Sequence, residues 1–110
     1  MKRGDIVLAL FPHASGTPAK RRPALVVSGP KLHRLGLMWL VMITGAGKQK
    51  RLGDVDLSDL QSAGLPGASL ARKSKIATVE PTRVLRRIGT LAKSERTHVA
   101  NSVRGLLAIP

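Results

Sequence analysis

Lys20-Arg21-Arg22-Pro23-Ala24-Leu25-Val26-Val27-Ser28 (residues 20–28) places three cations directly before an apolar run that has the composition of a β-strand. Proline is tolerated at the first position of a strand, where the ladder needs no N–H from it. A strand that starts at Pro23 would hold Arg22 in a fixed position at its N-terminal end. The stretch therefore predicts a β protein with a cationic site at a strand end; the alternative is a basic turn on the surface of a small β domain.

The neighbouring segments continue this strand pattern. Residues 2–12 read as a short strand between Gly and Pro, which predicts a hairpin with residues 20–28 through a loop at 13–20. The apolar run 37–43 predicts a central strand that is buried on both faces, with Trp39 in the core. Shorter segments predict three more strands, at 54–57, at 70–79 with an irregularity near Ser74, and at 84–91.

Only the C-terminal segment has helical spacing. Val99, Val103 and Leu107 recur every four residues, and Ser94 is a suitable capping residue. The apolar residues 106–110 at the end of this helix are expected to join the core. Because 110 residues suffice for one core, the chain is predicted to be a single domain, 1–110. Several short strands followed by one helix predict a mainly β (α+β) fold built as a small barrel.

The charge balance points to a negatively charged partner. The chain has 19 Lys and Arg against 6 Asp and Glu, a formal net charge of +13. Such an excess creates a positive surface potential, which favours nucleic acid first and an acidic protein segment second. The alternative is a charge excess that only maintains solubility. Aromatic residues make up only 2% of the chain, so a stacking platform of the kind found in RNA-recognition motifs is not expected.

Several classes of site are excluded by what the sequence lacks. Without cysteine there is no disulfide, thiolate metal site or cysteine nucleophile. The three histidines, His13, His33 and His98, lack the spacing of metal ligands. No apolar run approaches the roughly 20 residues of a membrane span, and no signal peptide is evident. We therefore expect a cytoplasmic protein with no metal, no cofactor and no membrane contact.

One reaction suits a site made of cations and hydroxyls. Cleavage of RNA by its own 2′-hydroxyl needs no metal and no protein nucleophile, only orientation, charge stabilisation and proton transfer. Arg22 is suited to stabilise the charged phosphorane, and Thr44, at the end of the central strand, to hydrogen-bond the same phosphate. Alternatively, Arg22 only pairs with an acidic residue such as Asp5, and Thr44 only ends its strand. No carboxylate lies beside either residue in sequence, so the general base is unassigned.

The other cations near these segments are candidates for binding the substrate. They are Lys20, Arg21, Lys48, Lys50, Arg72 and Lys75. Lys48 and Lys50, with Arg51, lie in a loop and are expected to attract phosphates with little sequence information. For Arg72 and Lys75 the alternative is a solvated rim of the barrel.

Six ordered segments together resemble the PemK/MazF toxins of bacterial type II toxin-antitoxin systems. They are residues 2–8, 22–28, 43–44, 64–65 followed by 69–72, 75–78 and 88–91. The resemblance implies an SH3-like, CcdB/MazF-type barrel with a C-terminal helix, a homodimer, and a metal-independent endoribonuclease. Its substrate is single-stranded mRNA, cut to a cyclic phosphate and a 5′-hydroxyl. It also implies an acidic antitoxin protein that blocks the RNA groove.

The resemblance assigns roles to particular residues. The family's catalytic arginine, in its Arg-Pro motif, falls on Arg22, and its catalytic threonine or serine falls on Thr44; Arg72 matches an arginine that acts in binding or catalysis in some members. Two positions depart from the family. Thr17 lies in the loop where some members have Glu or His, and Ser74 replaces an Asp that is common there. Both departures leave the acid and base of the reaction unassigned.

Two other functions fit the same sequence. The first is a noncatalytic toxin of the gyrase-poison type, which acts by protein contact, does not depend on Arg22 and uses its C-terminal helix to bind the target. The second is an RNA-binding barrel without turnover. Salt dependence does not separate this barrel from an enzyme, because both bind RNA through the same cations.

Overall fold

The computed structural model describes residues 1–11, 20–45, 54–58 and 60–107. In chain order, the elements within these residues are β1 (Asp5–Phe11), β2 (Lys20–Val26), α1 (Pro30–His33), β3 (Met38–Gly45), β4 (Val55–Leu57), α2 (Leu60–Ala63), β5 (Ser69–Val79), the 3₁₀ helix η1 (Pro81–Arg83), β6 (Val84–Thr90) and α3 (Lys93–Arg104). The predicted hairpin is present, because β1 and β2 pair antiparallel. No helix among these residues is long and apolar enough to cross a membrane.

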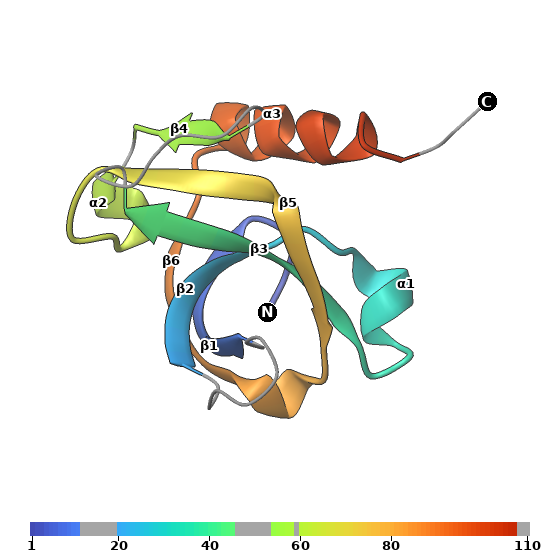
Figure 1. Cartoon of the computed structure of the whole chain (residues 1–110). Coiled ribbons are helices and arrows are strands. Elements are labelled where there is room, and N and C mark those ends of the chain that lie inside the picture. The colour runs from blue at the N-terminus through green and yellow to red at the C-terminus, as the bar shows by residue number, and fades with distance from the viewer. Residues whose placement is uncertain (12–19, 46–53, 59, 108–110) are drawn as a thin grey trace.

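The strands form one six-stranded sheet in the order β4-β5-β3-β2-β1-β6. Every pairing in it is antiparallel, and the sheet curls on itself while α3 lies along its top (Figure 1). The mainly β fold with a C-terminal helix is the one predicted. The barrel is incomplete, however, because β4 and β6 are the two ends of the sheet and the described residues form no ladder between them.

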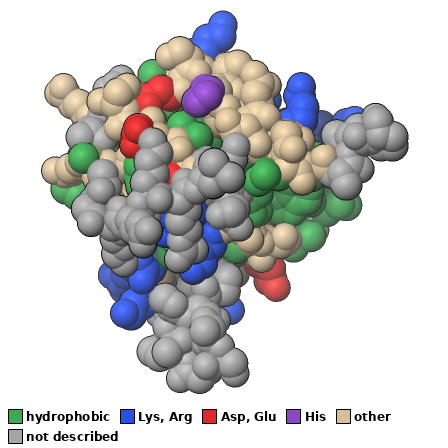
Figure 2. All heavy atoms as spheres, turned by 45° about the horizontal axis from the view of Figure 1, so that its top comes forward, with side chains coloured by type: hydrophobic (Ala, Val, Ile, Leu, Met, Phe, Trp, Pro, Cys, Tyr) green, Lys and Arg blue, Asp and Glu red, His purple; other side chains and the backbone are tan. Residues whose placement is uncertain are grey.

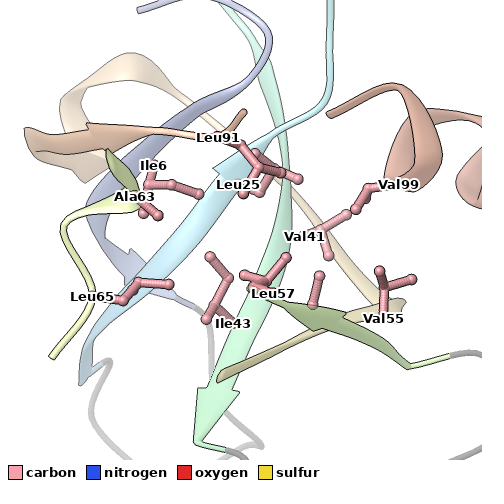
Figure 3. Packing of buried hydrophobic residues seen from close by; sticks show 11 residues of the cluster. Ile6, Leu25, Val41, Ile43, Val55, Leu57, Ala63, Leu65, Leu91 and Val99 are labelled. Carbon is pink, nitrogen blue, oxygen red and sulfur yellow. The ribbon is translucent and has the colours of Figure 1, made fainter. Parts of the chain in front are cut away.

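Apolar side chains pack on both faces of the sheet. Alternate residues of β3 belong to different clusters, with Val41 and Ile43 in one and Leu40 and Met42 in the other. Figure 3 shows the first cluster, in which β2, β3 and β4 meet Val99 of α3. The central strand is therefore buried on both faces, as predicted, and it holds the residues that end it in fixed positions.

Trp39 corrects the predicted core. Its side chain is 43% exposed, although it alternates with the buried Val41 and Ile43 on one face of β3. β3 begins beside α1, on the side of the sheet away from α3 in Figure 1, so the helix does not cover that end of the face. The length and composition of the apolar run predicted that Trp39 is buried, but they did not show how far the other elements cover the strand.

The C-terminal helix also differs from the prediction. It begins at Lys93, its N-cap is Ala92, and no side chain caps it, so Ser94 lies within the first turn. Val99 is fully buried, but Leu106 and Leu107 are 54% and 53% exposed. Because α3 ends at Arg104, these two leucines lie beyond its last turn and do not return to the sheet. The prediction that they join the core was wrong.

Gly64 brings the turn after α2 against β6, across the gap between the ends of the sheet. Its φ is +72°, and a Cβ built there would collide with the Ile88 carbonyl. We expect Gly64→Ala to lower the free energy of unfolding by about 2–3 kcal/mol, because the left-handed backbone and the contact both disfavour a side chain. Urea denaturation measures this loss. Gly29→Ala, where a Cβ meets nothing within 4 Å, is the control and should change little.

Candidate functional site

The register of the sheet brings Arg22 to Thr44. Ala24 of β2 is paired with Met42 of β3. The β2–β3 ladder ends at this pair, and the same register continued two residues further would place Arg22 opposite Thr44. Both side chains line the same pocket, which unites two residues that are 22 positions apart in the chain.

The pocket has a volume of about 360 Å³ and is lined by Arg22, Pro23, residues 43–45 and residues 65–69. Its polar side chains are Arg22, Thr44 and Ser69. The Ser69 hydroxyl donates a hydrogen bond of 2.8 Å to the Gly67 carbonyl, which holds the 65–69 turn. Pro66 and Gly67 are typical of a loop, but sequence reasoning did not connect this stretch with the site. The missing link was the register, which pairs Ser69 with Gly45 next to Thr44.

Arg22 has an unused hydrogen-bond donor inside the protein. Its Nε atom is buried and has no hydrogen-bond partner. Buried donors in folded proteins almost always have an acceptor, and leaving one unpaired costs about 1–3 kcal/mol. A group of this kind is suited to an acceptor that arrives with a ligand, such as a phosphate oxygen.

Asp5 does not supply that acceptor. Its carboxylate accepts hydrogen bonds from the Lys2 N–H (2.9 Å) and the Thr90 hydroxyl (3.3 Å) and lies 3.9 Å from Arg87. Asp5 also lies at the other end of β1, whereas Arg22 is paired with Ala9. The alternative that Arg22 serves only as a partner of Asp5 was therefore wrong.

Thr44 is the penultimate residue of β3 and lines the pocket. The residue is only 7% exposed, and no hydrogen bond joins its hydroxyl to another residue of the described chain. A guanidinium donor and a free hydroxyl thus face one space. The guanidinium can donate hydrogen bonds to an anion, and the hydroxyl can donate or accept a hydrogen bond.

Arg72 lies on neither an open RNA surface nor a solvated rim. Its Nε donates to both carboxylate oxygens of Asp54, at 3.3 and 3.2 Å, and its Nη2 donates to Oδ2 at 2.9 Å. The two side chains are 9% and 1% exposed. The hydrogen bonds to Asp54 raise the pKa of the Arg72 guanidinium above its ordinary value, although burial acts in the opposite direction. This geometry does not favour direct contact between Arg72 and a substrate.

The Asp54–Arg72 ion pair was not predicted from the sequence, because it forms between residues on two paired strands. Val55 of β4 is paired with Ala71 of β5, so the preceding Asp54 falls opposite Arg72. The predicted irregularity of β5 is present, because the β3–β5 register jumps from Ile76 to Arg72. Ser74 lies within this irregular segment.

The remaining predicted cations are only partly placed. Lys20 and Arg21 lie on β2 and Lys75 on β5, and all three are exposed. Their role in binding stays a prediction. Lys48 and Lys50, together with Arg51 and Thr17, lie outside the described residues. Figure 2 shows Lys and Arg side chains at several separate places on one face of the molecule, with a patch of hydrophobic side chains beside them.

Comparison with known proteins gives one family and one fold. Residues 2–107 match the family model of the PemK-like, MazF-like toxin of type II toxin-antitoxin system. No match to a curated protein was found.

Solved structures with the same fold include three toxins or endoribonucleases. MazF from Deinococcus radiodurans is 21% identical over 99% of this chain and 97% of its own, with a TM-score of 0.77. The Mycobacterium tuberculosis toxin MazF-mt6 is 20% identical over 92% and 93%, with a TM-score of 0.72. An endoribonuclease in complex with its cognate antitoxin, from a mycobacterial species, is 18% identical over 100% and 97%, with a TM-score of 0.72.

Proposed function

Since the chain belongs to the family of PemK-like, MazF-like toxins of type II toxin-antitoxin systems, we propose that it is a cytoplasmic endoribonuclease that cleaves single-stranded mRNA. The observation that carries this proposal is the shared pocket of Arg22 and Thr44, in which a buried guanidinium nitrogen has no partner. The net charge of +13 supports it, because such a surface attracts RNA over a distance.

The proposed reaction uses the RNA's own nucleophile. The 2′-oxygen attacks the adjacent phosphorus, a bond forms between them, and the bond from phosphorus to the 5′-oxygen breaks. The 2′-hydroxyl loses its proton to solvent, and the departing 5′-oxygen takes one up, which leaves a 2′,3′-cyclic phosphate and a 5′-hydroxyl. Arg22 donates hydrogen bonds to the non-bridging oxygens as their charge grows, and Thr44 orients the same phosphate.

The test is the cleavage of a long single-stranded RNA by the purified protein in the presence of EDTA. We expect discrete cuts whose downstream fragments carry 5′-hydroxyls that a polynucleotide kinase can label directly. Intact RNA after incubation with correctly folded protein would rule the proposal out. Thr44→Ala should lose the cuts as well, with unchanged circular dichroism as the control for folding.

A protein-contact toxin remains the second candidate because of Leu106 and Leu107. The buried C-terminal end expected from the sequence argued against a target-binding helix, but both leucines are exposed. A protein of this kind inhibits growth equally well with Arg22→Ala, and it does not cut RNA. Growth inhibition by the Arg22→Ala protein therefore separates the two candidates.

The partners follow from the family and the charge. Relatives have been crystallised as an endoribonuclease with its cognate antitoxin and as MazE-MazF. We infer an antitoxin for this chain as well. An acidic segment is the complement to a chain with 19 Lys and Arg against 6 Asp and Glu. The segment would inhibit by occupying the groove that receives RNA.

We also infer a homodimer, which would cover the apolar surface around Trp39. Trp39 (43% exposed) and Ile76 (40% exposed) lie on the same face of adjacent strands, because Val41 is paired with Ile76. Large apolar side chains that are exposed together are typical of a protein interface. Leu85, 43% exposed on β6, belongs to a different surface and provides a matched control.

Ile76→Asp is expected to convert the dimer to a monomer, because it buries a charge at the interface. Sedimentation should show the change, and the emission of the chain's single tryptophan should shift to the red. Leu85→Asp should leave both readouts as in the wild type. A dimer that persists in Ile76→Asp would place the interface elsewhere.

A further inference from the structure

We propose that the pocket beside Arg22 and Thr44 is a subsite for one unpaired nucleobase of the RNA, with the Leu65–Ser69 turn as the wall that selects the base. The inference rests on the proposed function, because it assigns the base that lies next to the cleaved phosphate. It concerns residues that the reaction itself does not use.

The lining of the pocket matches the two halves of a nucleotide. Pro23 and Pro66 offer apolar surface, to which the buried Ile43 and Leu65 add little, while Arg22 and Thr44 offer donors on the same pocket. A nucleotide has an apolar, flat base and an anionic phosphate. Because the chain has only one Trp, one Phe and no Tyr, aliphatic and proline side chains must supply the packing that aromatic rings supply in other RNA-binding proteins.

The size of the pocket suits a single residue of RNA. Its volume of about 360 Å³ lies at the lower end of the range of about 300–1,000 Å³ that is typical of small-molecule sites. A base enters such a space only when it is unstacked and unpaired. The pocket thus favours a single strand over a duplex through its shape, without further contacts.

Two glycines keep the pocket open. Gly45 and Gly67 both line it, and a Cβ at either position would meet nothing within 4 Å. Neither has a positive φ, in contrast to Gly64, so the backbone does not require glycine there. The missing side chains create space in the pocket, which is what a ligand-binding wall needs.

The selecting wall is fixed relative to Thr44. Ser69 pairs with Gly45 on β3 and with Leu57 on β4, and its hydroxyl holds the Gly67 carbonyl at 2.8 Å. A base packed against this turn therefore lies at a constant position from the threonine one residue before Gly45. Fixed geometry of this kind is the condition for a preference among bases at the cleavage position.

The experiment fills the pocket without touching Arg22 or Thr44. Gly67→Val and Gly45→Val are compared with Gly29→Val, which meets nothing within 4 Å and lies outside this pocket. The readouts are the distribution of cut sites on a long RNA and kcat/KM on a short substrate. We expect both pocket variants to lose about tenfold or more in kcat/KM and to shift their cut sites. Gly29→Val should behave as the wild type.

A binding measurement separates this inference from the proposed function. The probe is a short RNA with a 2′-deoxy residue at the cut position, which prevents cleavage, with either a base or an abasic residue next to it. We expect the wild type to bind the base-containing probe more tightly and Gly67→Val to lose that difference.

Each outcome decides one of the two claims. Wild-type cutting with unchanged sites and rates in both folded valine variants would overturn the subsite and leave the endoribonuclease standing. A wild type that does not cut overturns the endoribonuclease. In that case a base-dependent affinity that Gly67→Val abolishes supports the subsite, and equal affinity for both probes overturns it too.

Discussion

Arg22→Ala is expected to slow RNA cleavage by about 10²–10³-fold, which is the usual effect of removing one preorganised donor to a developing negative charge. The expected loss is mainly in kcat, because the guanidinium acts on the phosphorane more than on the bound RNA. Stability should not fall, because the variant removes a buried Nε that has no partner. Single-turnover cleavage and urea denaturation measure the two quantities.

Neighbouring arginines provide the controls for this prediction. Arg21 is exposed on the same strand, and Arg34 is exposed after α1. Arg21→Ala should weaken RNA binding and lower the salt dependence of that binding by about one unit of slope, with kcat unchanged. Arg34→Ala should change neither. An Arg22→Ala protein that cuts at the wild-type rate would remove Arg22 from the chemistry and favour a toxin that acts by contact.

Asp54→Ala should destabilise the fold by about 3–5 kcal/mol, the largest effect on stability that we expect from a single substitution. The variant leaves the Arg72 guanidinium, only 9% exposed, without the carboxylate that receives three of its hydrogen-bond contacts. Asp56→Ala is the matched control, because Asp56 is exposed on the same short strand. It should cost about 1 kcal/mol or less.

The double variant Asp54→Leu/Arg72→Met tests whether the loss comes from the unpaired charge. Replacing both members of a buried ion pair with apolar residues is often neutral, so most of the lost stability should return. Because the pKa of Arg72 is raised in the folded state, the pair's contribution through this group is present at neutral pH and lost only in strong alkali. Unfolding free energies that are equal for Asp54→Ala and the wild type would contradict the prediction.

The sequence was sufficient where a residue's neighbours along the chain determine its structure. Alternation and Gly/Pro boundaries located the strands. The predicted start at Pro23 was wrong, however, because β2 begins at Lys20 and Arg22 lies inside it, paired with Ala9 of β1. Thr44 could be predicted as a candidate site residue because it follows the longest apolar run. Both residues were also identified by resemblance to a family, and the structure then placed them in one pocket.

The sequence was insufficient for features that depend on the register between strands or on how far a helix covers a face of the sheet. Asp54 and Arg72 are 18 residues apart, and only the β4–β5 ladder makes them neighbours. The turn at 65–69 joins the site only because Ser69 is paired with Gly45. Trp39 and Leu106 were assigned to the core because an apolar pattern shows which face a residue occupies, but it does not show how far a helix covers that face.

The place of β1 between β2 and β6 determines when the sheet can be completed during synthesis. Asp5 is paired with Thr90, so the β1–β6 ladder cannot be completed before β6 has been synthesised. A ladder between such distant segments forms slowly, because a long loop must close first. In a nascent chain, β2 and β3, which carry Arg22 and Thr44, are therefore synthesised long before the sheet is complete. The complete sheet forms only after β6 has left the ribosome.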